Sequence, residues 1–197
     1  MINNIIYKII IKINDIYKRF CRKMLNKKYY LRFKHSKGQI GKGVKFGNNV
    51  NISGIDNIKI GDNVHIGTGC FFRGEGGLKI GDNVIISRNV IIYTSSHNYE
   101  GKLLPFDSSY LFKTVEIGRN SWVGMNVTIS PGTTIGEGVI IGLGSNVHGK
   151  IPELAIIGSE KPKIIKYRNK EHYYKLEKKK RYAKENGLSL NKEDDEK

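Results

Sequence analysis

His97 is the side chain of this sequence that is best suited to moving a proton. It stands in the segment TSSHNYEGKLLPF, where a regular repeat breaks off. An imidazole group has an ordinary pKa of roughly 6.5, so its neutral form can accept a proton near neutral pH. A lone histidine in a loop can equally be an ordinary polar surface residue. The elements that hold His97 therefore decide between the two interpretations.

The two cysteines, Cys21 and Cys70, offer less chemistry. Cys70 occupies a position at which neighbouring repeats carry valine, which favours a place in the core over a role as a nucleophile. The chain shows no signal-peptide pattern, so a disulfide framework is not expected and a reducing compartment fits. No apolar run approaches the roughly 20 residues of a membrane-spanning helix.

A six-residue repeat surrounds His97. From Ile40 onward, an aliphatic residue or phenylalanine recurs every six positions and is usually followed by glycine. The fourth residue of each unit is glycine or asparagine, which accept a positive φ most readily. We therefore expect a left-handed backbone conformation at one point of every unit, namely at Gly43, Asn49, Asn63, Gly69, Asn83, Asn89, Asn120, Asn126, Gly132, Gly138 and Gly144.

The units group in threes. A step of eight residues replaces the step of six between Ile52 and Ile60, and again between Phe72 and Ile80. Three short strands per turn build a triangular coil, whose stacked copies form parallel sheets with strands about 4.8 Å apart. The sequence thus predicts an all-β fold, a parallel β-helix of five coils over residues 40–160.

The break in the repeat falls at the same corner. The step from Ile92 to Ile117 is 25 residues, which is 17 more than at the two earlier corners. The inserted loop, residues 94–116, contains several aromatic residues. Loops of this length are uncommon in compact domains unless they serve a function. His97 stands where this loop leaves the coil.

The segment VIIYTSSH, together with the repeat, resembles the pattern [VI]-x-[IL]-x-[ST]-x-x-H of hexapeptide-repeat acetyltransferases. The resemblance covers about residues 40–166. It implies a left-handed parallel β-helix, a homotrimer in which the loop reaches a neighbouring subunit, acetyl-CoA as the acyl donor, and His97 as the general base. A sugar hydroxyl is too weak an acid to ionise at neutral pH, so it must lose its proton as it attacks the thioester. Backbone N–H groups could stabilise the oxyanion that forms.

The resemblance also implies an acetyl-CoA site at the last coils. An apolar channel and cationic donors for the phosphates would come from Trp122, Met125, Gly142, Leu143, Gly144, Lys150, Lys163 and Lys166. Taken alone, the tryptophan could pack on the flank of the coil, and each lysine could be solvated surface. The stretches GSNVHGK and GSEKPK depart from the family's pattern, which leaves the nucleotide contacts open.

Four residues are predicted to contact the acceptor. Arg73 and Glu75 lie one coil below His97 at the same corner and could bind sugar hydroxyls, or could be a solvated corner. Asn98 and Tyr99 follow His97 directly. No metal is expected, because the carbonic anhydrases of this fold use three histidines, two of them five residues apart, and this sequence has no such pair.

Basic segments flank a neutral repeat region. Of the net charge of +16, residues 1–39 carry +10 and residues 161–197 carry +6. The first segment has the pattern of an amphipathic helix, which could lie on an anionic membrane or cap the first coil. The last contains a charged helix from about Glu171 to Gly187. Recognition motifs for nucleic acid are missing, so no nucleic acid is expected as a partner.

The sequence therefore predicts an acetyl-CoA-dependent O-acetyltransferase that acts on a carbohydrate hydroxyl of a cell-surface, capsular or lipopolysaccharide glycan intermediate. Two alternatives stay open. One is an acetyltransferase of an antibiotic or another small molecule. The other is a non-catalytic β-helix that docks on a membrane or a partner. We expect the protein in the cytoplasm, and at the inner face of the membrane if the first helix binds lipid.

Overall fold

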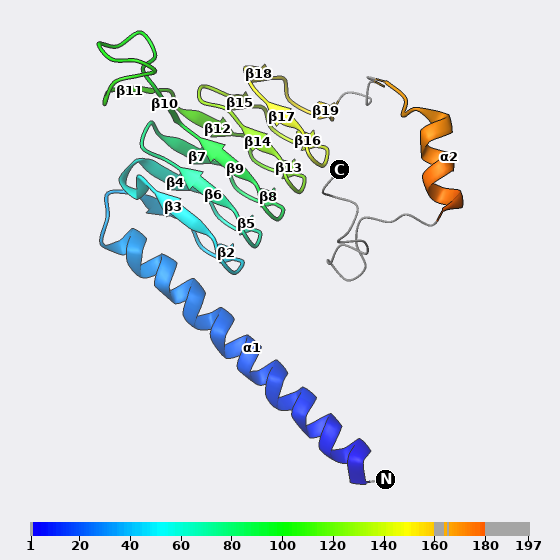
Figure 1. Cartoon of the computed structure of the whole chain (residues 1–197). Helices are drawn as coiled ribbons and strands as arrows, with labels where there is room; N and C mark the ends of the chain where they lie inside the picture. The colour runs from blue at the N-terminus through cyan, green and yellow to red at the C-terminus, as the bar shows by residue number, and fades with distance from the viewer. Residues whose placement is uncertain (1, 160–163, 165, 180–197) are drawn as a thin grey trace. The chain divides into compact units, whose positions relative to one another are not determined.

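The computed structural model describes residues 2–159, 164 and 166–179, without the side chains of residues 2–6, 9 and 22. The chain divides into two units, Met1–Ser159 and Glu160–Lys197. The first unit contains a long N-terminal helix and a parallel β-helix, and the second contains a short helix (Figure 1).

Three parallel sheets, named A, B and C here, form the sides of the β-helix. The A sheet contains β1 (Gln39–Ile40), β4 (Ile58–Ile60), β7 (Leu78–Ile80), β12 (Val115–Ile117), β15 (Thr134–Ile135) and β18 (Lys150–Ile151). The B sheet contains β2 (Lys45–Phe46), β5 (His65–Ile66), β8 (Ile85–Ile86), β13 (Trp122–Val123), β16 (Ile140–Ile141) and β19 (Ile156–Ile157). The C sheet contains β3 (Asn51–Ser53), β6 (Phe71–Arg73), β9 (Ile91–Tyr93), β14 (Thr128–Ile129) and β17 (Asn146–Val147).

The chain runs from A to B to C and then climbs to the next coil, so each corner is named after the two sheets that it joins. The predicted left-handed parallel β-helix is confirmed. Five coils are complete, as predicted, and β18 and β19 begin a sixth coil that the prediction did not include. A short 3-10 helix, η1 (Ile55–Asn57), lies at the first C–A corner.

The corner residues adopt the predicted conformation. All eleven expected asparagines and glycines have a positive φ, from 53° at Asn49 to 81° at Gly132. Asparagine side chains also link neighbouring coils at the A–B corner, where Asn63 Nδ2 donates to Asn83 Oδ1 at 3.0 Å and Asn83 Nδ2 donates to Asn120 Oδ1 at 3.2 Å. The repeat therefore encodes both the turn and a contact between successive turns.

Aliphatic side chains fill the interior of the coils. The fifth residue of each unit points inward, and Val64, Val84 and Val90 are fully buried. Cys70 is in the same column with no exposed surface, and burial raises the pKa of its thiol. The core position predicted for Cys70 is confirmed, since a buried thiol with a raised pKa is a poor nucleophile.

The N-terminal helix, α1 (Ile2–Lys34), caps the first coil with its last turns. Tyr29 and Phe33 are buried there, and the Tyr29 ring stacks on Phe46 with ring centroids 4.3 Å apart. The Tyr30 hydroxyl donates to the carbonyl oxygen of Gly41 at 3.1 Å. The capping role is thus present, but only in this part of the helix, because the described side chains of residues 7–21 are all exposed.

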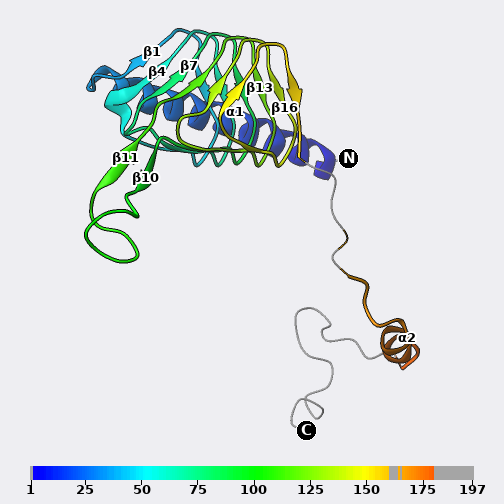
Figure 2. The same cartoon turned by 90° about the horizontal axis from the view of Figure 1, so that it is seen from above.

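The insertion at the third C–A corner forms a hairpin. β10 (Ser95–His97) and β11 (Tyr110–Phe112) pair antiparallel, and Figure 2 shows this hairpin projecting from one corner of the β-helix. The chain re-enters the A sheet at β12, with Val115 paired to Leu78. The sequence predicted the place of the insertion but not its strands, because the segments SSH and YLF follow neither the repeat nor a clear alternation.

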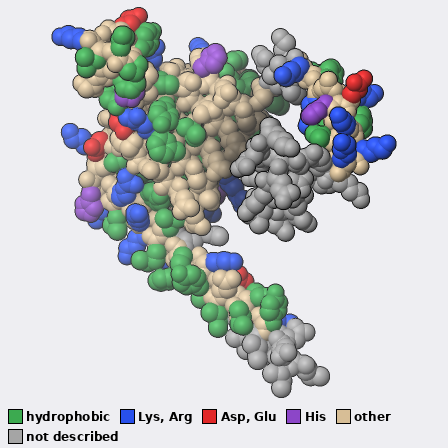
Figure 3. Space-filling model, viewed as in Figure 1, with side chains coloured by type: hydrophobic (Ala, Val, Ile, Leu, Met, Phe, Trp, Pro, Cys, Tyr) green, Lys and Arg blue, Asp and Glu red, His purple; other side chains and the backbone are tan. Residues whose placement is uncertain are grey.

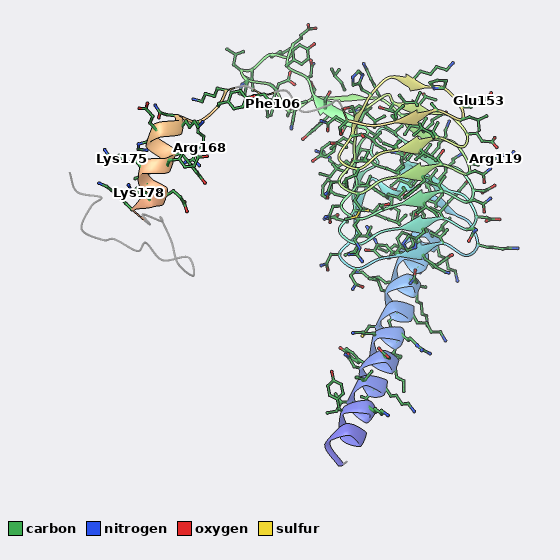
Figure 4. All side chains as sticks on the ribbon, turned by 90° about the vertical axis from the view of Figure 1, so that its right-hand side faces the viewer. Phe106, Arg119, Glu153, Arg168, Lys175 and Lys178 are labelled. Atoms are coloured by element: carbon green, nitrogen blue, oxygen red, sulfur yellow. The ribbon has the colours of Figure 1, made fainter. Side chains whose placement is uncertain are left out.

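The second unit contains α2 (Lys170–Lys178). The Asn169 side chain caps this helix by accepting a hydrogen bond from the backbone N–H of His172 at 2.8 Å. Arg168 lies with its guanidinium 4.9 Å from the centroid of the Tyr173 ring, and Figure 4 labels it beside the helix. A charged helix was expected here, and its predicted end at Gly187 lies outside the described residues.

Candidate active site

A buried threonine builds the corner below His97. Thr94 is fully buried and donates its hydroxyl proton to the carbonyl oxygen of Arg73 at 2.7 Å. The same hydroxyl oxygen accepts the backbone N–H of Gly76 at 2.8 Å. One side chain therefore fixes the turn that carries Arg73 and Glu75 against the strand that leads to His97.

Aromatic rings hold the imidazole of His97. Residue pairing in the hairpin places His97 opposite Tyr110, and the two ring centroids are 4.5 Å apart. The Phe106 ring stacks on the imidazole with the centroids 3.9 Å apart. Figure 4 labels Phe106 in the projecting loop, on the other side of the β-helix from Arg119. The imidazole is half-buried and in contact with two rings, as expected for a group that must be held in one orientation.

Arg73 connects the lower coil to this cluster. Its guanidinium carbon lies 5.4 Å from the centroid of the Tyr110 ring and 5.6 Å from that of the Tyr93 ring. Its Nε atom lies 3.6 Å from Oε2 of Glu75. Burial alone would lower the pKa of Arg73, but the bond to Tyr110 and the charge of Glu75 raise it above its usual value. Arg73 is thus a fixed cation beside the histidine cluster.

Three buried polar atoms at this corner have no hydrogen-bond partner within the described residues. They are Oε2 of Glu75, Oγ of Ser95 and Nδ1 of His97. Buried polar atoms are normally paired, because an unpaired one costs about 1–3 kcal/mol. All three atoms are shielded from solvent, so they belong to the interior of this corner, and Oε2 of Glu75 is balanced there by the charge of Arg73.

The other two residues predicted to contact the acceptor, Asn98 and Tyr99, do not contact the His97 ring. Asn98 shapes the loop, since its Nδ2 donates to Oγ of Ser109 at 3.2 Å and its Oδ1 accepts the N–H of Glu100 at 3.1 Å. Tyr99 is 70% exposed. The rings that contact His97 are those of Phe106 and Tyr110, which the sequence analysis did not select. The pairing of β10 with β11 selects them, and the sequence carries no periodic signal for it.

Most of the predicted donor residues lie together at another edge. Trp122 is on the outer face of the B sheet, 52% exposed, and its Nε1 donates to Oγ of Ser87 at 3.2 Å. Met125 and Leu143 are exposed at the adjacent B–C corner of successive coils. The N–H of Gly144, next to Leu143, donates to the carbonyl oxygen of Met125 at 2.8 Å. With the backbone of Gly142, these residues form a strip of exposed apolar side chains on the B sheet and its B–C corner, a surface of the kind that the pantetheine arm of coenzyme A needs.

The predicted lysines are not part of this strip. Lys150 is exposed on the A sheet, where β18 pairs it with Thr134. Lys166 belongs to the second unit, and Lys163 lies outside the described residues. Other basic side chains approach the strip instead: Lys45, His65 and Arg88 line, with Met125, an open hollow of about 650 Å³. A constant step of 20 residues between coils relates Lys45 to His65, and this spacing could have found the hollow from sequence.

The residues predicted to bind the acceptor and the donor lie at different corners of the β-helix. His97 and Arg73 are at the C–A corner, and Met125 and Leu143 are at the B–C corner, with the C sheet between them. The fold and the site together define a class, the left-handed β-helices built of hexapeptide repeats, here with a histidine at the base of an inserted hairpin.

Comparisons with known proteins agree with this class. A family model described as bacterial transferase hexapeptide (six repeats) matches residues 114–149, and one described as hexapeptide repeat of succinyl-transferase matches residues 57–94. A maltose O-acetyltransferase from Clostridium difficile 630 is 32% identical, with a TM-score of 0.59, over 64% of this chain and 67% of that chain. The chain belongs to the hexapeptide-repeat transferase family.

Two further relatives carry related names. A galactoside acetyltransferase solved in complex with coenzyme A is 25% identical, with a TM-score of 0.62, over 85% of this chain and 78% of that chain. The galactoside O-acetyltransferase of Escherichia coli (strain K12) is 34% identical over 94 residues, which are 46% of each chain. The matches to curated relatives span 37% and 46% of the length of those proteins.

Proposed function

We propose that this protein is an acetyl-CoA-dependent O-acetyltransferase whose acceptor is a carbohydrate hydroxyl, on a cell-surface, capsular or lipopolysaccharide glycan intermediate. The observation that carries the proposal is the cluster at the C–A corner, where the rings of Phe106 and Tyr110 contact His97 and the Arg73–Glu75 ion pair lies beside Tyr110. The relatives named for maltose and galactoside support a sugar as the acceptor.

His97 acts as the general base. Its Nδ1 atom is buried, so proton transfer runs through Nε2. Nε2 takes the proton of the acceptor hydroxyl while that oxygen forms its bond to the acetyl carbon. Acetyl-CoA supplies the acetyl group as a thioester, and its carbon–sulfur bond breaks. The imidazolium then returns the proton to the departing thiolate, which leaves His97 neutral for the next turnover.

Arg73, Glu75 and the aromatic rings bind the acceptor. A carboxylate and a guanidinium side by side offer both acceptors and donors to vicinal hydroxyl groups. Phe106 is 43% exposed and offers an apolar surface to the C–H groups of a sugar ring. Trp122, Met125 and Leu143 would hold the donor, since they form an exposed apolar strip beside basic groups.

The complete site forms between protomers of a homotrimer. Donor and acceptor clusters lie at different corners, so one protomer's B–C corner has to meet another's C–A corner. Such a head-to-tail contact closes into a ring when the rotation allows it. The outer faces of the sheets differ in a way that supports this contact. Lys79 and Glu116 form an ion pair on the A sheet, whereas the B sheet exposes Ile85 and Trp122 as apolar surface for a neighbouring protomer. We place the enzyme in the cytoplasm, where acetyl-CoA is available.

The decisive experiment is acetyl-CoA turnover against a panel of sugars and nucleotide sugars. His97→Ala should lower turnover by roughly 10²–10⁴-fold and leave acetyl-CoA binding by calorimetry unchanged. His35→Ala, at an exposed histidine after α1, is the matched control and should keep full activity. Full activity of His97→Ala would refute the assignment of the base.

The same measurements separate the alternatives. Turnover with small alcohols or antibiotics but with no sugar would favour the small-molecule acetyltransferase. A chain that does not bind acetyl-CoA in calorimetry would favour the non-catalytic β-helix. A monomer in analytical ultracentrifugation that turns over at the full rate would contradict the shared site.

A further inference from the structure

Helix α1 has two apolar faces, and only one of them is covered. Tyr29 and Phe33 pack on the first coil. Phe20 and Met24 precede them by nine residues each, which is about two and a half helical turns and places them on the opposite side. Their side chains are 61% and 52% exposed. The β-helix therefore cannot cover this second face.

The second face is a continuous stripe. Most of its members follow one another at helical spacings of three or four residues, Ile16 and Tyr17 are adjacent, and the last step is seven residues. All are between 44% and 66% exposed: Ile10, Ile13, Ile16, Tyr17, Phe20, Met24 and Leu31. Hydrophobic side chains form patches along α1 in Figure 3. Exposed apolar surface of this extent marks an interaction site.

Basic side chains are frequent on the exposed helix outside the stripe, where Tyr7 and Ile11 are also exposed. Lys12, Lys18 and Arg19 are exposed on the side of the helix away from the stripe. Residues 1–39 contain eleven lysine or arginine residues and a single acidic one, Asp15. An apolar stripe bordered by cations, with almost no acidic residue, is the composition of a helix that lies in the plane of an anionic membrane surface.

We propose that α1 docks the protein on anionic phospholipid bilayers, with this stripe in the acyl boundary and the basic side chains among the headgroups. The helix lies on the membrane and does not cross it, since no helix in the described part of the chain has the length and apolar content of a spanning segment. The proposal is independent of the catalytic assignment, because it uses none of the residues of the C–A corner.

The positive charge of α1 argues against a second copy of the helix as the partner that covers the stripe. Two α1 helices joined along the stripe would bring Lys23, Lys27 and Lys28 close to their counterparts, with Asp15 as the sole acidic partner in each helix. Like charges at such positions oppose pairing. A bilayer with anionic headgroups instead neutralises them.

Sedimentation of the full chain with phospholipid vesicles tests the proposal. The protein should bind vesicles of phosphatidylcholine with phosphatidylglycerol, should not bind phosphatidylcholine alone, and should be released by high salt. Ile13→Asp and Asn14→Asp change the charge equally at adjacent exposed positions, but only Ile13 is on the stripe. Asn14→Asp should weaken binding by roughly fivefold. Ile13→Asp should weaken it by at least about tenfold more, since it also removes the burial of an isoleucine.

Several outcomes would overturn the proposal. Equal effects of the two substitutions would show that the apolar stripe does not enter the bilayer. Equal binding to neutral and anionic vesicles would show that the basic side chains of α1 do not bind the anionic headgroups. Failure to bind either kind of vesicle, with a change of molar mass in Ile13→Asp by light scattering, would show that a second copy covers the stripe. Unchanged thermal unfolding in both variants verifies that the β-helix is intact.

Discussion

Replacing Thr94 by valine tests how the C–A corner is held. The Thr94 hydroxyl donates to the carbonyl oxygen of Arg73 at 2.7 Å and accepts the N–H of Gly76 at 2.8 Å. Valine has nearly the same shape, so Thr94→Val removes both hydrogen bonds without opening a cavity. The turn that carries Arg73 and Glu75 then loses its link to the strand that leads to His97.

The expected loss of stability follows from these two hydrogen bonds. The carbonyl oxygen of Arg73 still accepts the backbone N–H of Thr94 at 3.0 Å in the variant. Losing the hydrogen bond from the Thr94 hydroxyl therefore costs about 1 kcal/mol of stability. The N–H of Gly76 has no other hydrogen-bond partner among the described residues, and leaving a half-buried donor unsatisfied costs about 1–2 kcal/mol. The free energy of unfolding should therefore fall by about 2–3 kcal/mol. That is a large part of the 5–15 kcal/mol typical of a domain.

Two assays apply, with a matched control. Urea unfolding measures the change in free energy, and hydrogen exchange should show faster exchange of the Gly76 amide in particular. Thr114→Val is the control, because Thr114 is exposed and donates one hydrogen bond to the carbonyl oxygen of Gly76 at 2.9 Å. It should cost less than about 1 kcal/mol. Equal costs for the two variants, or unchanged exchange of Gly76 in Thr94→Val, would refute the reasoning.

Three further predictions address the core, the loop and the corners. A thiol reagent should modify Cys21, which is exposed, and should leave Cys70 unmodified in the folded protein, because Cys70 is buried and its pKa is raised; labelling of both at equal rates would contradict this. Hydrogen bonds from Ser109 and from the backbone of Lys102 lower the pKa of Asp107 below its ordinary value of 3.8. These contacts are therefore present above pH 3.8 and are lost as the pH falls through the lower pKa of the folded protein. The amide shift of Lys102 in NMR should titrate with a midpoint below 3.8. Asn83→Ala should cost about 1–2 kcal/mol in urea unfolding because alanine disfavours a φ of 56°, and Asn83→Gly should cost less; the reverse order would show that the amide ladder dominates.

Most of the β-helix could be predicted because its code is local. Each six-residue unit contains its own turn residue and its own inward residue, so Asn49 or Val64 can be assigned from the units around it. The constant step between coils also relates residues of neighbouring coils, which is why Arg73 could be placed below His97. The resemblance of VIIYTSSH to a family pattern then suggested the role of His97.

The rest of the site depended on pairings that no period encodes. The hairpin brings Phe106 and Tyr110 to His97, and it forms within an insertion that breaks the repeat. Lys150 follows the donor residues in sequence, yet the next corner of the coil turns it onto the A sheet.

The sequence by itself determined the three-sided coil, its corners and its core, because the steric preference of asparagine and glycine for positive φ and the burial of every sixth residue act within a few residues of chain. Only the tertiary structure decided which side chains meet at the C–A corner and which face of α1 remains uncovered. Those outcomes depend on contacts between segments far apart in the chain, where packing and hydrogen bonding, rather than local conformation, select the partners.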